Sequence, residues 1–437
     1  MTDTAQTPII ADAPLHVNAL RILGVTATRS SFLNSATAHV FEAKTTADVL
    51  RNVQEVAVKL QKHDIFDEIK VYLDSNHGVT DTVDMTIHLK EKPKTLLKTA
   101  FGVSENEATL NGGIYVRNLF GGAETFSTSY TFGNRTKAAW EAFLGMPING
   151  SPYAKIEAFV NSSVKDHSII NYYKEQASSV GARFKGESSY GQHQITYALI
   201  NRDLTALSES SATVRAHSGP NVKSSVFHSF VRDERDNATM PTSGHYVGFF
   251  QEFAGVGNRG DSQFLKSELA AQYHRTLATN SNGWRLVLSA GIKSGFNASL
   301  DNKELNVSDR LYLGGPLSVR GFKMGGIGPR NGNDALGGEA YWAAGASLVS
   351  TIPGAAHLPV KAHAFFNAGN IIPWDKATPL NTTITTLSED PRTSAGFGLI
   401  FHHDVARVEA NFCIPLRFKT GDVPKPGFQI GLGINFL

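Results

Sequence analysis

The feature that most constrains this fold is an alternation of apolar side chains with polar or small ones, which recurs over most of the segment from Thr95 to Leu437. The segment 428–436, FQIGLGINF, places an apolar side chain at every second position. The segments 125–132, 137–146, 154–160 and 284–293 repeat this pattern. A period of two indicates a β-strand with one apolar face. The region therefore predicts a mainly β structure with many strands.

Two architectures share such strands. A soluble sandwich buries its apolar faces, whereas a membrane barrel exposes them to lipid. The runs here are about 10 residues long, which is typical of a membrane barrel with a polar lumen. At roughly 20 residues per strand and loop, residues 95–437 give about 16 or 17 strands, and an even number is favoured. We therefore expect a 16-stranded antiparallel transmembrane β-barrel over 95–437, with 210–232 as one irregular strand. The soluble sandwich is the alternative.

The first 94 residues follow a different pattern. Residues 1–14 fit neither a secretory signal nor a mitochondrial presequence and are expected to be a flexible tail. After Thr45, which forms a capping-box pattern with Asp48, apolar residues recur at helical spacing. Alternating stretches at 69–73 and 83–89 predict strands, and the charged segment Lys90–Lys94 marks a boundary. Residues 15–94 are therefore predicted to form a small α+β domain.

The composition argues against several classes of function. Lys and Arg number 41 against 39 Asp and Glu, so nothing indicates the clustered basic charge that a nucleic-acid partner would need. Cys413 is the single cysteine, which excludes an internal disulfide and a cysteine-based metal site. No catalytic constellation stands out. We expect no enzyme activity, no metal and no cofactor.

Two local motifs have simpler explanations than the ligands they suggest. Residues 255–260, GVGNRG, match a dinucleotide-binding pattern, yet a strand-like alternation follows where that site needs a helix. His402, His403 and Asp404 could suggest a metal, but adjacent histidines point to opposite faces of a strand. A hairpin turn is the favoured interpretation of this second motif.

Three further motifs occur in order along the barrel region. SVRGFKMGGIGPR, at 318–330, lies in a Gly-rich stretch over 295–337 that predicts neither helix nor regular strand, and loops of that length are usually functional or disordered. In QIGLGINF, at 429–436, the polar Gln429 is followed by Gly431 and then by the apolar Ile434 and Phe436. RDERDNATMPTSG, at 232–244, joins acids that can end a strand to a tight turn, with candidate residues Asp233, Arg235, Asp236, Pro241, Thr242 and Gly244.

These motifs resemble hallmarks of the outer-membrane barrel-assembly insertase superfamily. The resemblance implies that the long loop folds back into the lumen, where Arg320 pairs with polar groups on two inner strands. An arginine inside a barrel needs an acceptor, because an unpaired buried charge is costly. Glu339 is expected to be its charged partner. The remaining expected residues of this site are Val319, Gly321, Phe322, Asn367 and Gly369.

The terminal pattern and a single N-terminal domain, which the resemblance identifies as POTRA-like, are similar to the mitochondrial branch of that superfamily, the central barrel of the sorting and assembly machinery. This implies insertion and folding of β-barrel precursors in the mitochondrial outer membrane, with the N-terminal domain in the intermembrane space. The implied partners are β-barrel precursor proteins, peripheral cytosolic-side subunits of the machinery, outer-membrane lipid and, as a further candidate, a second barrel subunit.

The same resemblance implies a lateral gate between the first and last strands. A client strand would enter there by pairing with an opened strand edge. A passive outer-membrane pore and a polypeptide-translocating relative from chloroplasts or bacteria are the alternatives. The predicted gate residues are Leu97, Lys98, Thr99, Ala100, Phe101, Gly102, Val103, Phe428, Gln429, Ile430, Gly431, Leu432, Gly433, Ile434, Asn435 and Phe436.

Overall fold

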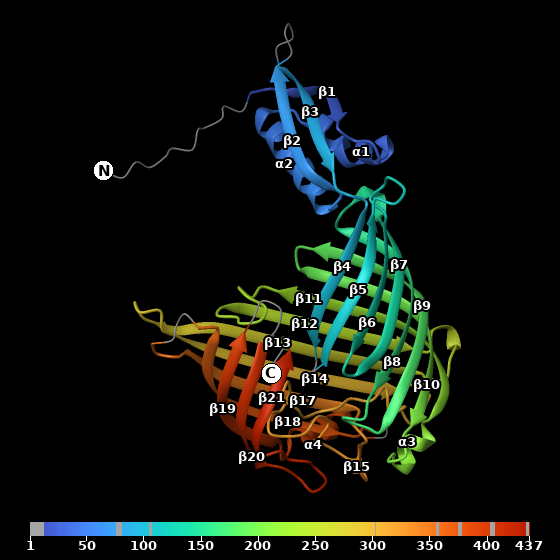
Figure 1. The fold of residues 1–437 in the computed structure, drawn as a ribbon, viewed down its shortest axis with the longest axis vertical. Coiled ribbons are helices and arrows are strands. Elements are labelled where there is room, and N and C mark those ends of the chain that lie inside the picture. The colour runs from blue at the N-terminus through green and yellow to red at the C-terminus, as the bar shows by residue number, and fades with distance from the viewer. Residues whose placement is uncertain are drawn as a thin grey trace.

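The protein consists of a small N-terminal α+β domain and one large antiparallel sheet that curves around a lumen (Figure 1). The computed structural model describes residues 13–75, 81–104, 107–301, 303–354, 358–374, 378–402, 407–433 and 437. Most of the expected flexible tail, residues 1–12, lies outside the described residues.

The N-terminal domain packs its helices against one face of a three-stranded sheet of order β1-β3-β2, in which β1 and β3 are parallel. The Thr45 side chain accepts a hydrogen bond from the Asp48 N–H, so the predicted cap begins the long helix. Alternate residues of β3, including Met85 and Ile87, are buried against the helices. The elements are β1 (His16–Leu23), α1 (Ser30–Thr37), η1 (Ala38–Glu42), α2 (Thr46–Lys62), β2 (Phe66–Ser75) and β3 (Thr82–Glu91).

The large sheet contains sixteen strands, and each one pairs antiparallel with its neighbour. Chain order and sheet order agree throughout, with β14 joined to β17 across the long loop. The strands are β4 (Thr95–Ser104), β5 (Glu107–Arg117), β6 (Thr125–Gly133), β7 (Thr136–Pro147), β8 (Ala154–Asp166), β9 (Tyr173–Ser188), β10 (Gly191–Ala206), β11 (Gly219–Asp233), β12 (Gly244–Ala254), β13 (Phe264–Thr279), β14 (Arg285–Ser299), β17 (Ala340–Thr351), β18 (Val360–Ile372), β19 (Arg392–His402), β20 (Arg407–Arg417) and β21 (Gly427–Gly433).

The apolar face of this sheet points outward. On β20, Phe412 and Ile414 are 47% and 46% exposed, whereas Glu409 and Asn411, on the other face, are fully buried. A sandwich would bury the apolar face instead. The soluble sandwich is therefore wrong for this chain, and the outer face is the kind that lipid covers in membrane barrels.

Two predicted boundaries need correction. Residues 210–232 do not form one irregular strand: a short helix, α3 (Ala212–Ala216), precedes β11. Ser211 caps that helix by accepting a hydrogen bond from the Val214 N–H. The loop predicted over 295–337 spans 300–339, because β14 keeps its ladder to Ser299. The remaining elements are η2 (Ile148–Gly150), η3 (Val256–Asn258), β15 (Arg330–Asn331), β16 (Asp334–Ala335) and α4 (Leu380–Ser388).

Candidate functional site

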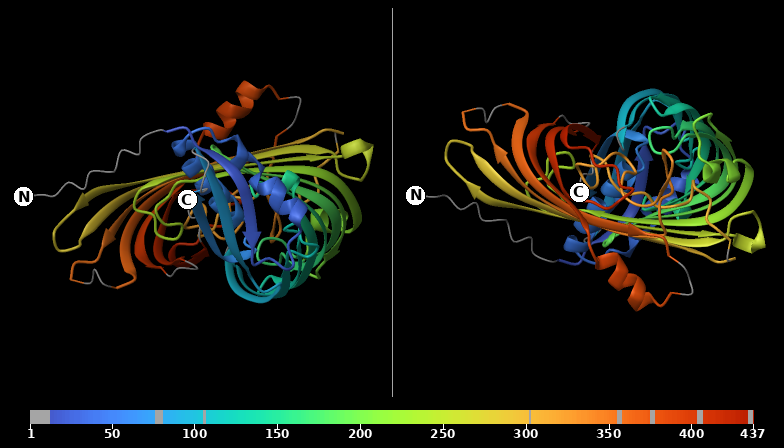
Figure 2. Two further views of the ribbon diagram at one scale, coloured as in Figure 1. Left: turned by 90° about the horizontal axis from the view of Figure 1, so that it is seen from above. Right: turned by 90° about the horizontal axis from the view of Figure 1, so that it is seen from below.

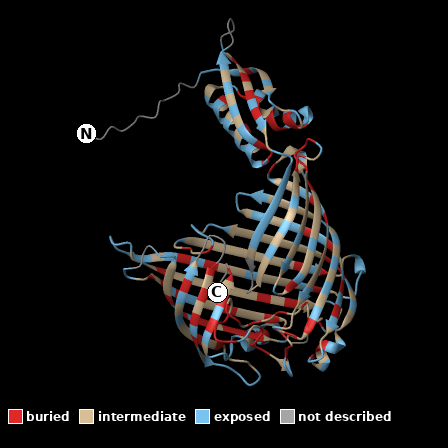
Figure 3. Ribbon diagram, viewed as in Figure 1, coloured by how far each residue is buried: buried red, intermediate tan, exposed pale blue. Residues whose placement is uncertain are grey.

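The 300–339 loop lies inside the curved sheet, and the two views along the barrel show it crossing the lumen (Figure 2). Buried residues gather where the loop meets β17–β21, while β4–β7 are mostly exposed or intermediate (Figure 3). The loop therefore packs against one side of the lumen and leaves the first strands uncovered.

Arg320 is fully buried at the centre of this packing. Its guanidinium forms a two-pronged bond with Glu409 on β20, with Nε to Oε2 at 3.0 Å and Nη2 to Oε1 at 3.3 Å. Nη1 donates to Asn367 Oδ1 on β18 at 3.1 Å and to the Leu437 carbonyl at 3.0 Å. The guanidinium also lies 4.8 Å from the ring centroid of Phe365. Charge-assisted bonds with this forked geometry fix both the position and the orientation of the guanidinium.

The expectation that Glu339 is the charged partner is wrong. Glu339 stands one residue before β17, at the rim, where its carboxylate lies 3.7 Å from Arg310 and accepts from the Trp374 N–H at 3.1 Å. Arg320 instead pairs with Glu409 on β20, three strands further along the sheet than β17. The alternating sequence of β20 could have indicated Glu409, because it puts this side chain on the other face of the sheet from Val408 and Ala410. Choosing it required knowing how far the loop crosses the lumen.

The residues around Arg320 fix the backbone of the loop. The Gly321 N–H donates to Gln429 Oε1 at 3.0 Å, and Gln429 Nε2 donates to the Phe322 carbonyl at 2.9 Å. Gly321 has a φ of +82°, a conformation that favours glycine. Val319 and Phe322 are fully buried in a cluster with residues of the same loop.

Gly369 gives the loop room to approach the wall. A Cβ built on it would lie 3.0 Å from Val319 Cγ2 and 2.8 Å from the Trp342 carbonyl. A larger residue at 369 would push the loop away from β18. The structural role of Gly369, which the resemblance assigned to the site of Arg320, is therefore to let the loop approach β18 closely.

Two further anchors, which sequence reasoning missed, hold the loop on either side of Arg320, one near its start and one near its end. Asp309 is buried between Arg202 on β10 and Lys223 on β11, with the Lys223 Nζ at 3.1 Å. Asp334 accepts from the backbone N–H groups of Tyr172 and Ser211 at 2.7 and 2.6 Å. The loop therefore bridges the middle strands of the sheet and its last strands.

The turn motif at 232–244 is closed by Asp236. Its carboxylate accepts from Thr242 Oγ1 at 2.5 Å and from the Thr242 and Ser243 N–H groups at 2.8 and 3.1 Å. Arg235 pairs with Asp233 at 2.7 Å and donates to Gln272 on β13 at 3.0 Å. Pro241 lines a small pocket near Leu437. The motif is thus a hydrogen-bonded turn that faces the lumen.

We predict that Gly244→Ala destabilises the barrel by about 1–3 kcal/mol, the usual cost of a strained backbone. Gly244 has a φ of +97°, and a Cβ there would lie 2.1 Å from the Glu234 carbonyl. Gly257→Ala is the control, because Gly257 has a φ of +68° but open space around it. Midpoints of urea unfolding should fall further for Gly244→Ala. Equal midpoints would contradict the steric argument.

The first and last strands form the two edges of the sheet. Among the described residues, no β-ladder joins β4 to β21. Residues 95–101 are all exposed, and Leu97 is 76% exposed. Gln429 turns to the loop instead of to β4. Of the predicted gate residues, Ile434, Asn435 and Phe436 lie outside the described residues.

The N-terminal domain touches the rim of the sheet through several loops. Asn118 Nδ2 donates to Thr28 Oγ1 at 2.8 Å, Arg117 Nη1 donates to the Asp64 carbonyl at 3.0 Å, and Arg29 pairs with Glu124. His63 Nε2 donates to the Gly150 carbonyl at 3.2 Å. These contacts attach the domain to the turns after β5 and β7.

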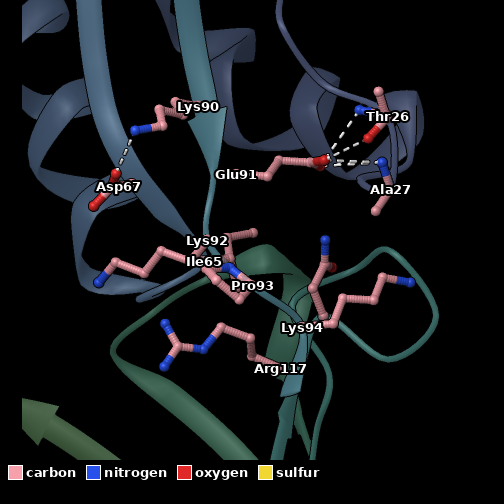
Figure 4. Close-up of a pocket in the computed structure, with 11 residues that line it drawn as sticks. Thr26, Ala27, Ile65, Asp67, Lys90, Glu91, Lys92, Pro93, Lys94 and Arg117 are labelled. Atoms are coloured by element: carbon pink, nitrogen blue, oxygen red, sulfur yellow. Dashed lines mark hydrogen bonds and ion pairs between the residues drawn. The ribbon is translucent and has the colours of Figure 1, made fainter. Parts of the chain in front are cut away.

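A cavity of about 610 Å³ lies at this junction (Figure 4). Lys90 pairs with Asp67 at 2.9 Å on one side of it. On the other, Glu91 accepts the backbone N–H groups of Thr26, Ala27 and Thr28. Burial alone would raise the pKa of Glu91, but these hydrogen bonds outweigh it and lower the pKa to about 2. The cavity is thus bordered by charges that already have partners.

We predict that acidification destabilises the N-terminal domain at its contact with the sheet, where the ring of His63 is packed. Burial lowers the pKa of His63 from 6.5 to about 4. Between these values the unfolded state takes up a proton that the packed ring does not, so stability is lost as pH falls from 6.5 to 4. Melting temperatures of the N-terminal domain at pH 7 and pH 5 test this. The drop should be smaller in His63→Phe, and an identical drop would rule out His63 as the cause.

The described residues offer no metal site and no membrane-spanning helix. No group of three or more His, Cys, Asp and Glu side chains could hold a metal ion there. In the described part of the chain, no helix is long and apolar enough to cross a membrane. The GVGNRG motif forms η3 and leads into β13, so no helix follows it.

The fold and the site together define a class of protein, a sheet of sixteen antiparallel strands with a lumenal loop that a buried arginine holds. Comparison with known families agrees with this class. The Omp85 superfamily domain matches residues 118–436. This chain therefore belongs to the Omp85 superfamily. Within it, the chain is similar to the SAM50-like protein of Schizosaccharomyces pombe, with 31% identity over 97% of this chain and 91% of the relative. It is also similar to the sorting and assembly machinery component 50 homolog of Homo sapiens, with 29% identity over 99% and 93%.

Solved structures share the fold. BamA from Haemophilus ducreyi lacking POTRA domains 1–3 superimposes with a TM-score of 0.77 at 15% identity, covering 96% of this chain and 84% of that chain. CdiB from Acinetobacter baumannii gives a TM-score of 0.53 at 12% identity, covering 96% and 73%. At such identities the likeness concerns the fold.

Proposed function

We propose that this protein inserts and folds β-barrel precursors into the mitochondrial outer membrane through a lateral gate between β4 and β21. The observation that carries the proposal is the seam between β4 and β21, across which the described residues form no β-ladder. The described strands form a complete antiparallel series except between these two edges. An open edge in lipid is costly because its N–H and C=O groups lack partners. A client strand would supply them.

The proposed mechanism is strand addition. Residues 97–103 of β4 expose backbone groups to which a client's C-terminal strand can add, as in β-augmentation. The glycines of β21, Gly431 and Gly433, weaken that strand because glycine offers no side chain to pack. The client strand can therefore take the place of β21 at the edge of β4.

The loop keeps the rest of the wall in shape while the seam is open. Arg320 ties it to β18 and β20, and Asp309 ties it to β10 and β11. The described hydrogen bonds and ion pairs of the loop do not involve β4–β7, so those strands are free to move. A passive pore would have no need for this bridge across its lumen.

The similarity to the SAM50-like proteins supports the location and the partners. By that similarity we place residues 15–94 as a POTRA-like domain in the intermembrane space, and the even strand number then brings the end of β21 to the same side. External protease on intact mitochondria should leave it protected. The partners are β-barrel precursors, peripheral cytosolic-side subunits of the sorting and assembly machinery, outer-membrane lipid and a second barrel subunit.

Reconstitution tests the function. The purified protein is placed in liposomes and supplied with an unfolded β-barrel precursor. We expect the precursor to become resistant to protease and to alkaline extraction faster than in protein-free liposomes. A helical membrane protein serves as the control client. Equal rates with and without the protein would refute insertase activity, and conductance without insertion would favour the passive pore.

A further inference from the structure

The helix α4 lies outside the barrel wall, against the strands β17 and β18 (Figure 2). Trp342 Nε1 donates to the Leu387 carbonyl at 2.9 Å. Asn370 Nδ2 donates to the carbonyls of Leu387 and Glu389 at 2.9 and 3.1 Å. These side chains satisfy the carbonyl groups that a helix leaves free at its C-terminus. The helix is therefore fixed to the wall.

The face that α4 covers is the outward one. Trp342 and Asn370 are direct partners across β17 and β18. Trp342 is an even number of residues from Leu348, which is 45% exposed on the apolar outer face. Asn370 is nevertheless fully buried, because α4 lies over it. The helix thus occupies a place that lipid would otherwise fill.

The chemistry of α4 suits this place. Its sequence, LNTTITTLS, has no charged residue, and Ile384 is 64% exposed. Three of its five hydroxyl groups donate to backbone carbonyls: Thr383 Oγ1 to Pro379, Thr385 Oγ1 to Asn381 and Ser388 Oγ to Thr385. Back-bonded hydroxyls do not depend on water for their partners. The absence of charge and the exposed Ile384 therefore suit partial removal of this helix from water, and its other polar groups suit a headgroup layer.

Aromatic rings mark the height of α4 along the barrel. Trp374, just after β18, packs at a tilt against Phe296 near the end of β14, with centroids 4.6 Å apart. Trp342, the third residue of β17, lies directly under the helix. Trp rings gather at the boundary between lipid tails and water because they have an apolar body and a polar edge. The end of β14, the start of β17 and the end of β18 lie at the rim remote from the N-terminal domain, because that domain contacts the turns after β5 and β7 and successive strands alternate in direction.

We propose that α4 is an interfacial anchor that lies in the lipid headgroup layer of the leaflet remote from the N-terminal domain, with Ile384 directed toward the acyl chains. This rests on the membrane location given under the proposed function. The helix would fix the depth of β17 and β18 while the strands at the seam move.

Depth-dependent fluorescence quenching tests the anchor. An environment-sensitive dye is attached to Ile384→Cys in phosphatidylcholine liposomes that carry a nitroxide either near the headgroup or deep in the chains. Phe397→Cys, at the middle of β19 and 60% exposed, reports the membrane interior. Tyr72→Cys, on the N-terminal domain and 49% exposed, reports water. The wild-type chain, whose Cys413 is buried, is the labelling blank.

We expect the dye at 384 to lose fluorescence mainly with the shallow nitroxide, the dye at 397 mainly with the deep one, and the dye at 72 with neither. If the dye at 384 is quenched by neither nitroxide, like the dye at 72, the anchor is overturned and α4 is open to a protein partner. Deep quenching of the dye at 397 in the same experiment would show that the membrane barrel itself stands. Deep quenching at 384 would also overturn an interfacial position. Loss of quenching at both 384 and 397 would refute the membrane location itself.

Discussion

Arg320→Ala is expected to destabilise the barrel by about 3–5 kcal/mol, the usual cost of removing one partner of a buried ion pair, and to reduce precursor insertion in the liposome assay. The substitution removes the forked bond to Glu409 and the donors for Asn367 and the Leu437 carbonyl. Glu409 keeps Arg407 as a partner, but it stays fully buried with one cation fewer. The temperature at which the folded band is lost on a gel measures the first effect.

A matched control and a double variant make this result specific. Lys323→Ala changes a cation in the same loop that is exposed, and it should leave both readouts near wild type. Arg320→Ala combined with Glu409→Gln should cost less than the sum of the single changes, because the two side chains are coupled. Additive losses would mean that the ion pair does not hold the loop.

A disulfide across the seam is expected to reduce precursor insertion to the rate of protein-free liposomes, while the barrel stays folded. A client strand has to pair with the edge of β4, and a disulfide between β4 and β21 would keep that edge closed. Cysteine pairs with one partner in 97–103 and the other in 428–433 can be scanned for oxidation. Only pairs whose Cα atoms approach within about 4.4–6.8 Å form the bond without distortion.

The matched control joins Leu97 to Ile114, which are direct partners on β4 and β5. That disulfide staples a pair of strands that need not separate, so insertion should continue. Reduction should restore activity to the seam variant. Normal insertion through a verified locked seam would refute strand addition and favour a route through the lumen.

The period of two made much of the fold predictable, because a strand that is wet on one face and apolar on the other must alternate. The outward position of Phe412 and Ile414 and the inward position of Glu409 all follow from the sequence of β20. Arg320 could be recognised through the resemblance of its loop motif to a known superfamily, since an arginine in a Gly-rich loop would by itself be expected in solvent.

What the sequence could not supply were distances across the lumen. Glu339 and Glu409 both belong to alternating segments, and only the path of the loop decides between them. The helix α4 was equally hidden, because five of its nine residues are threonine, isoleucine or other β-branched types that favour strands. Its helical state depends on Trp342 and Asn370, whose contacts appear only when the wall is assembled.

The placement of the arginine's partners has a consequence for biosynthesis. Glu409 on β20 and Gln429 on β21 leave the ribosome after the loop that carries Arg320. Until they arrive, the loop has a cation without its counter-ion and a backbone turn without its amide partner. The loop can therefore reach its final packing only after β20 and β21 have been made, which couples closure of the loop to completion of the last two strands.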